Sequence, residues 1–72
     1  MEAWQHLEDI PKGSTVTDGK EFFTVEPWIS APIEPGRFGI YYRIKRWGDG
    51  KIFRVRSSWN TKYIVLEEKQ ND

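Results

Sequence analysis

The chain has 72 residues, of which 38% are hydrophobic and 31% are charged, and it contains no cysteine. This length predicts one small domain over residues 1–72, and the composition excludes a disulfide framework, a thiolate metal site and a transmembrane helix. Eleven lysine and arginine residues balance eleven aspartate and glutamate residues, so the net charge of zero indicates no partner.

The apolar residues are mostly of the kinds that favour β-structure. The sequence contains 15 Val, Ile and Thr residues and 11 aromatic residues, but only four Leu and Ala residues. β-branched and aromatic side chains lose rotamer freedom on a helix and pack well on a pleated sheet. The composition therefore predicts a mostly β fold.

Residues 1–10 are the first predicted element. Trp4, Leu7 and Ile10 recur every three residues, which fits about two turns of helix with one apolar face. Pro11 would end this helix, because the residue before a proline avoids the helical region. A helix this short is marginal unless it docks on a sheet, and an extended N-terminal arm is the alternative.

Two short strands are predicted next, over residues 15–17 and 21–25. Asp18-Gly19 lies between them, and Asp-Gly between β-rich runs is a strong signal for a hairpin. The pattern predicts a type I′ turn, which requires positive φ at both central residues.

Residues 27–37 contain three of the four prolines. We expect a Pro-rich irregular loop here, because proline removes a donor from a sheet ladder. Trp28, Ile29 and Ile33 give this loop apolar side chains, so we expect it to pack over one end or edge of the sheet.

The clearest element is a central basic hairpin over residues 38–59, with its turn at Asp49-Gly50. A two-residue turn there would set Lys45 opposite Arg54 and Ile44 opposite Val55. The alternation then separates a core face from an outer face. The core face carries Phe38, Ile40, Tyr42, Ile44, Phe53, Val55 and Trp59.

The charges are segregated along the chain. Residues 1–36 contain two cations and seven anions, whereas residues 37–62 contain eight cations and one anion. The basic block coincides with the central hairpin. The outer face of this hairpin carries Tyr41, Arg43, Lys45, Trp47, Arg54 and Arg56.

Like charges opposite one another on a sheet are destabilising, so the outer cations require compensation. One interpretation is internal pairing with Glu21, Glu26 or Glu67. A second is nucleic acid, because a basic sheet with interleaved aromatic rings suits phosphate contact and base stacking. A third is an acidic protein surface.

The four tryptophans and Arg46 are expected in different environments. We expect Trp4 and Trp59 to lie in the core and Trp47 to be exposed beside the hairpin turn, while Trp28 fits a core position and an exposed one equally. The alternation places Arg46 on the core face. We therefore expect its aliphatic part to extend past the edge of the sheet and its guanidinium group to pair with Glu8 or Asp9.

No group of residues points to catalysis, a cofactor or a metal ion. His6 is the only histidine, and Ser14, Ser57 and Ser58 have no paired base. The turn over residues 48–51 lacks the spacing of a phosphate-binding loop. We expect no enzymatic activity, no cofactor, no metal site and no membrane association. Since no basic segment followed by an apolar one opens the chain, we also expect a cytoplasmic protein.

A last strand is predicted over residues 61–67. The whole pattern predicts a mostly β, single-domain antiparallel sheet or small barrel of four to five strands, with a short N-terminal helix or arm. Its run of short strands with a Pro-rich connection is generically similar to small SH3-type barrels. The resemblance is one of architecture without a shared motif, so it implies no functional residue.

The sequence thus predicts a non-enzymatic binding module, with nucleic acid (DNA or RNA) as the first partner. Arg43, Lys45, Arg54 and Arg56 would contact phosphates, and Tyr41 and Trp47 would stack on bases. Secondary candidates are Trp28, Arg37, Lys51 and Lys62. The alternatives are a protein–protein interaction adaptor or inhibitor, such as a bacterial or phage accessory protein, and a structural subunit of an oligomer.

Overall fold

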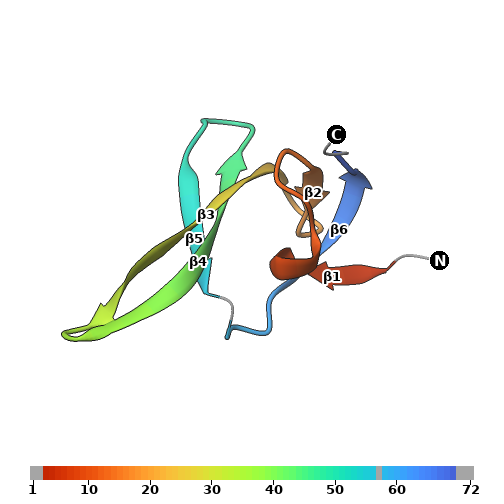
Figure 1. The fold of residues 1–72 in the computed structure, drawn as a ribbon. Coiled ribbons are helices and arrows are strands. Elements are labelled where there is room, and N and C mark those ends of the chain that lie inside the picture. The colour runs from red at the N-terminus through yellow and green to blue at the C-terminus, as the bar shows by residue number, and fades with distance from the viewer. Residues whose placement is uncertain (1–2, 57, 70–72) are drawn as a thin grey trace.

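Six strands form one antiparallel sheet in the computed structural model of the chain, which describes residues 3–56 and 58–69 (Figure 1). The strands lie in the order β1-β6-β2-β3-β4-β5, so β1 and β5 are the two edges. The strands are β1 (Trp4–His6), β2 (Thr15–Thr17), β3 (Phe22–Glu34), β4 (Arg37–Arg46), β5 (Ile52–Arg56) and β6 (Lys62–Glu67), and one 3-10 turn, η1 (Leu7–Asp9), follows β1.

The N-terminal segment is a strand followed by a single turn, and the α-helix predicted within residues 1–10 is wrong for the described part of that segment. β1 pairs with β6, and Gln5 lies opposite Tyr63. Pairing with a strand satisfies the backbone of β1, whereas two isolated helical turns would be marginal. The sheet therefore has six strands where four or five were expected. Residues 1–2 lie outside the described residues.

The hairpin between β2 and β3 is confirmed, but its predicted type I′ turn is wrong. Thr17 lies opposite Phe22, which leaves a loop over residues 18–21. No non-glycine residue in the described part has positive φ, so Asp18 lacks the conformation that a type I′ turn needs. The Asp18 carboxylate instead accepts hydrogen bonds from the backbone N–H groups of Lys20 (2.8 Å) and Glu21 (2.9 Å), which stabilises the longer loop.

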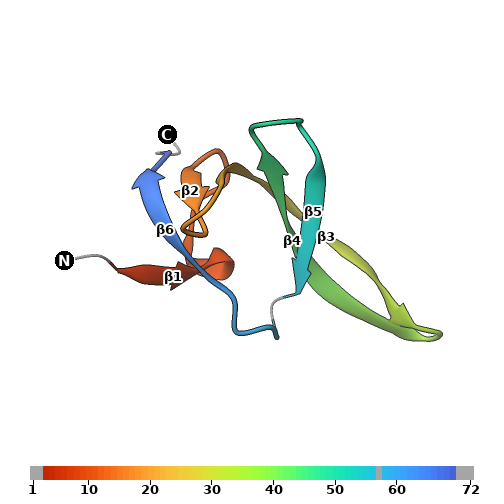
Figure 2. The ribbon, with the colours of Figure 1, turned by 180° about the vertical axis from the view of Figure 1, so that it is seen from behind.

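The loop expected over residues 27–37 is also wrong, because β3 continues through Pro27 and Pro32 as far as Glu34. The ladder to β4 shifts register after Glu26 and after Pro32, and β2 pairs only with the first three residues of β3. Proline is tolerated at such bulges and on such an open edge. The two strands therefore form a two-stranded arm, residues 29–40, which projects from the rest of the sheet (Figures 1 and 2).

The two faces of the central hairpin follow the predicted alternation, but the predicted cross-strand partners are wrong. Arg43 lies opposite Arg54 and Ile44 opposite Phe53, so each partner lies two residues earlier in β5 than expected. The cause is a four-residue loop over residues 47–50, closed where the N–H of Arg46 donates to the carbonyl of Lys51 at 2.9 Å. A shift of two residues keeps every side chain on its face.

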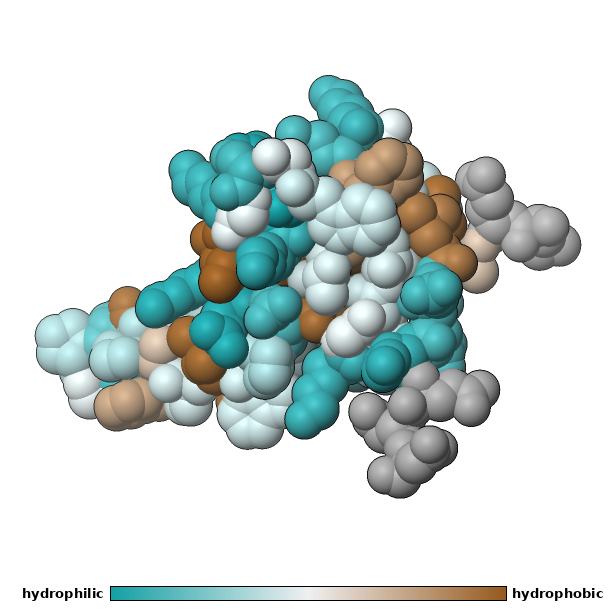
Figure 3. All heavy atoms as spheres, turned by 90° about the horizontal axis from the view of Figure 1, so that it is seen from above, coloured by the Kyte–Doolittle hydropathy of each residue, from teal (hydrophilic) through white to brown (hydrophobic). Residues whose placement is uncertain are grey.

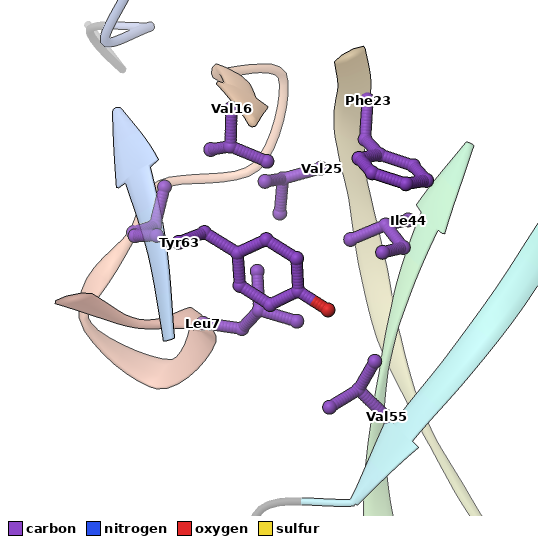
Figure 4. Packing of buried hydrophobic residues seen from close by; sticks show 8 residues of the cluster. Leu7, Val16, Phe23, Val25, Ile44, Val55 and Tyr63 are labelled. Carbon is purple, nitrogen blue, oxygen red and sulfur yellow. The ribbon is translucent and has the colours of Figure 1, made fainter. Parts of the chain in front are cut away.

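Phe23 of β3 contacts both β5 and β6, and Figure 4 shows it among the buried residues of the core. Its ring meets Phe53 of β5 and Tyr63 of β6 edge-on, each with 6.3 Å between centroids. β5 and β6 are not neighbours in the sheet order, so these contacts require the concave faces of the two halves to meet. The buried core consists of Leu7, Ile10, Val16, Phe23, Val25, Ile44, Val55 and Tyr63.

Several large apolar side chains lie on the surface. All four tryptophans are between 46% and 59% exposed, so the core positions expected for Trp4 and Trp59 are wrong and the exposure of Trp47 is confirmed. Phe38 shares the core face but is 68% exposed, because it lies on the arm, which projects beyond the other strands (Figure 1). Figure 3 shows hydrophobic and weakly polar residues intermixed along this projection.

Candidate functional site

The outer side of β4 and β5 brings the predicted site residues together. Tyr41 lies opposite Arg56, Arg43 opposite Arg54, and Lys45 opposite Ile52. Because side chains alternate along a strand, these residues lie on the side away from the buried Ile44 and Val55. We call this surface the cationic face and define it by Tyr41, Arg43, Lys45, Trp47, Arg54 and Arg56.

The cations of this face have no acidic partner among the residues that the structure describes. The ion pairs within 4.0 Å in that part of the chain join Arg37 to Glu34, and Arg46 to Glu21 and Asp49. The internal pairing expected from Glu21, Glu26 or Glu67 is therefore not found there. In particular, Glu26 lies opposite Arg43 in the ladder but makes no ion pair with it.

Arg43 and Arg54 face each other across the ladder as a pair of like charges. The Nε–H of Arg43 donates to the carbonyl oxygen of Pro27 at 2.8 Å, which fixes its position without neutralising it. Like-charged residues directly opposite each other weaken a sheet. An anion bound beside Arg43 and Arg54 would offset this repulsion.

Tyr41 supports the guanidinium groups. The guanidinium carbons of Arg54 and Arg56 lie 5.8 and 5.9 Å from the centre of its ring, within the range of a cation–π contact. Tyr41 is only partly exposed. Its ring therefore orients the two arginines, and the base-stacking role expected for it is not favoured by this geometry.

Arg56 lies at the base of the arm. A Cβ added to Gly39 would lie 3.5 Å from an Nη2 atom of Arg56 and only 2.5 Å from Cδ1 of Ile33, so the missing side chain at position 39 leaves room for both neighbours. The Nε of Arg56 is buried and has no hydrogen-bond partner in the described part of the chain. Since buried polar groups nearly always have partners, the protein's own contacts leave this guanidinium incompletely satisfied.

Trp47 lies at the end of the cationic face nearest the loop, and Phe22 lies beside it. Their ring centroids are 5.7 Å apart with 41° between the ring planes. Sequence reasoning missed Phe22 as a site residue. The signal was present, because Phe22 and Phe23 are adjacent in a strand and must point to opposite faces, so that one of them lies outward.

The four secondary candidates lie apart from the cationic face. Arg37 is at the tip of the arm and pairs with Glu34 at 2.9 Å. Lys51 lies over the ring of Phe53 at 5.3 Å, and Lys62 begins β6, which does not pair with β4 or β5. Trp28 lines a separate cleft of about 500 Å³, together with Leu7, Glu8, Ile10, Glu26 and Tyr42.

Arg46 is held by internal contacts, and the acidic partners expected for it, Glu8 and Asp9, are wrong. Its Nε and Nη2 atoms donate to the two carboxylate oxygens of Asp49 at 3.0 and 2.6 Å. Asp49 is brought there by the tight turn that follows β4, whereas Glu8 and Asp9 belong to η1, outside that hairpin. Hydrogen bonding from the Arg46 guanidinium, followed by that from the backbone N–H of Lys51, holds the pKa of Asp49 well below its usual value of 3.8.

We expect replacement of Asp49 by Asn to change how the stability of the protein depends on pH. The folded state lowers the pKa of Asp49, so the carboxylate stabilises the fold fully above pH 3.8 and progressively less as the pH falls below it. The melting temperatures of wild type and Asp49→Asn should therefore differ at neutral pH and converge in acid. A difference that stays constant from neutral pH down to about pH 2 would contradict this assignment.

Comparison of the chain with protein-family models, curated proteins and solved structures found no match. Within residues 3–56 and 58–69, no three His, Asp or Glu side chains gather in a way that could hold a metal ion. The same residues form no helix long and apolar enough to cross a membrane. The cationic face is therefore the feature of the described residues that bears most directly on function.

Proposed function

We propose that this protein is a non-enzymatic binding module that binds nucleic acid through the cationic face. The observation that carries the proposal is the set of four cations, Arg43, Lys45, Arg54 and Arg56, on one face without a carboxylate within 4.0 Å in the described part of the chain. A phosphate backbone supplies a row of anions and releases bound counterions when it meets such a surface.

The opposed pair Arg43 and Arg54 favours an external anion over a merely solvated face. Two like charges across a ladder weaken the sheet, and among the described residues no carboxylate, including that of the adjacent Glu26, pairs with either arginine within 4.0 Å. A bound phosphate between the two guanidinium groups would form charge-assisted hydrogen bonds with both. The absence of cysteine suits a reducing, cytoplasmic setting for such a module.

We also propose that the curled sheet is a partly closed barrel of the SH3 type. The support is Phe23, whose contacts with Phe53 and Tyr63 draw the two halves of the open sheet together. In this architecture the outer side of β4 and β5 is a convex surface that a ligand can reach.

The salt dependence of binding tests the proposed function. The binding constant is measured by fluorescence anisotropy with labelled duplex DNA, single-stranded DNA and RNA at about 50 and 200 mM salt. For four phosphate contacts, the logarithm of the binding constant should fall with the logarithm of the salt concentration with a slope of about −3. Arg43→Ala and Arg54→Ala should each reduce the slope by about one and weaken binding to all sequences alike.

Lys62→Ala is the matched control, because it removes a cation from β6 outside the cationic face. It should leave the slope unchanged. The proposed function is wrong if wild type binds none of the three nucleic acids at about 50 mM salt, or if Lys62→Ala weakens binding as much as Arg54→Ala.

A protein-interaction adaptor is the second candidate, and the cleft beside Trp28 favours it. This cleft of about 500 Å³ has a buried apolar floor at Leu7 and Ile10 and the half-exposed Trp28 at its rim. Exposed aromatic side chains at such places are common binding hot spots. If no nucleic acid binds, a pull-down compared between wild type and Trp28→Ala would test this candidate.

A further inference from the structure

An aromatic pair, Phe22 and Trp47, lies at one end of the cationic face, and the proposed phosphate contacts do not involve it. We infer that the ligand of this face is single-stranded nucleic acid, and that Phe22 and Trp47 form the platform on which its bases stack. The inference rests on the proposed function and adds the class of nucleic acid and the mode of base contact.

Phe22 and Trp47 form an exposed aromatic surface at one end of the row of cations. Phe22 is 50% exposed and Trp47 is 59% exposed, and their rings lie 5.7 Å apart. Along β4 the residues Tyr41, Arg43 and Lys45 lead to Trp47 in alternating positions, each about 6.7 Å from the next. A nucleic acid strand that follows the cations would therefore bring its bases to this aromatic pair.

Three contacts hold Trp47 in place. Its backbone N–H donates to the carbonyl of Phe22 at 3.0 Å, its indole Nε1–H donates to Oγ1 of Thr24 at 2.9 Å, and its ring packs beside Phe22. A ring fixed before binding loses little conformational entropy when the ligand arrives. Because the indole N–H is already used, Trp47 offers a base only the face of its ring, which predicts contact by stacking without discrimination among base sequences.

Tyr41 does not provide an equivalent platform. Arg54 and Arg56 lie over its ring at 5.8 and 5.9 Å. Base stacking therefore belongs to Trp47 and Phe22, and phosphate contact belongs to the arginines that Tyr41 orients.

Stacking on an aromatic side chain requires a base whose face is free, and the bases of a duplex are stacked on one another. The shape of the surface also disfavours a duplex. The cations of this face lie on β4 and β5, and β4 has β3 as its other neighbour. The DNA major groove admits a helix or a two-stranded ribbon, whereas β3, β4 and β5 together make the sheet three strands wide at this face. An unpaired strand can lie across such a surface with its bases turned toward the protein.

An oligonucleotide without bases separates stacking from phosphate contact. Three labelled probes of equal length are compared: oligo(dT), an abasic oligonucleotide and a duplex. Their length is about 12 nucleotides, which is within the range of known single-stranded binding sites. Wild type should bind oligo(dT) about 5- to 150-fold more tightly than the abasic strand. It should also bind oligo(dT) more tightly than the duplex.

Variants of the aromatic pair give the second part of the test. Trp47→Ala and Phe22→Ala should each lower the affinity for oligo(dT) by about 5- to 150-fold and leave the affinity for the abasic strand unchanged. Trp59→Ala is the matched control, since this tryptophan is 51% exposed but lies near Tyr63 and Val55 on the concave side. It should change neither affinity.

A fluorescence measurement keeps the test valid if Trp47→Ala fails to fold. In a protein with Trp4, Trp28 and Trp59 all replaced by Phe, the remaining Trp47 should be quenched by oligo(dT) and not by the abasic strand. Equal binding of oligo(dT), abasic strand and duplex, without selective quenching, would overturn the inference and leave the proposed function intact. Failure to bind any of the three probes or labelled RNA would overturn both.

Discussion

Replacement of Phe23 by alanine is expected to lower the free energy of unfolding by about 3–5 kcal/mol. Phe23 is 4% exposed and is the one described residue whose ring meets aromatic rings of both β5 and β6. A chain of 72 residues has a total stability of roughly 4–11 kcal/mol, so this single loss would remove much of it. Urea denaturation followed by circular dichroism measures the change.

Two further variants make this prediction specific. Phe23→Leu keeps most of the buried volume and should lose clearly less stability than Phe23→Ala. Phe38→Ala removes the same side chain from the arm, where it is 68% exposed, and should change the free energy of unfolding by no more than about 0.5 kcal/mol. If Phe38→Ala destabilised the protein as much as Phe23→Ala, the arm and not the curl around Phe23 would hold the fold together.

Replacement of Arg54 by glutamate is expected to raise stability and abolish nucleic acid binding together. The change converts the like-charge pair with Arg43 into a pair of opposite charges, which should stabilise the sheet by about 0.2–1 kcal/mol. The same change places an anion in the middle of the cationic face and repels phosphate. Binding that is measurable in wild type at about 200 mM salt should then disappear.

Lys62→Glu is the control for net charge, because it changes the total charge by the same amount at a position on β6. It should preserve binding and leave stability nearly unchanged. A destabilised Arg54→Glu would mean that the arginine pair contributes to folding. The unfavourable pair would then no longer be evidence for a ligand.

The alternation of apolar and charged residues correctly predicted which side of each strand of the central hairpin faces the core. Ile44 and Val55 are buried and Arg43 and Arg54 lie on the opposite side, as the alternation predicted. This prediction survived an error of two residues in the cross-strand partners, because side-chain direction has a period of two and depends only on local backbone geometry. The composition also predicted a mostly β chain, because β-branched and aromatic side chains lose rotamer freedom on a helix and pack well on a pleated surface.

The sequence did not determine which segments pair or which faces are covered. Trp4 became part of an edge strand because β6, far away in the chain, offered it a partner. Pro27 and Pro32 entered a strand because β2 ends early and leaves that edge of β3 open.

Strand pairing also determines the neighbours of the candidate site residues. Phe22 lies beside Trp47 because the ladder between β3 and β4 sets the start of β3 against the end of β4. Arg46 contacts Asp49 through the loop over residues 47–50, whose conformation the sequence pattern did not show. Local patterns give each side chain a direction, but the pairing of distant strands decides which side chains of other strands it contacts, because that pairing depends on packing between residues far apart in the chain.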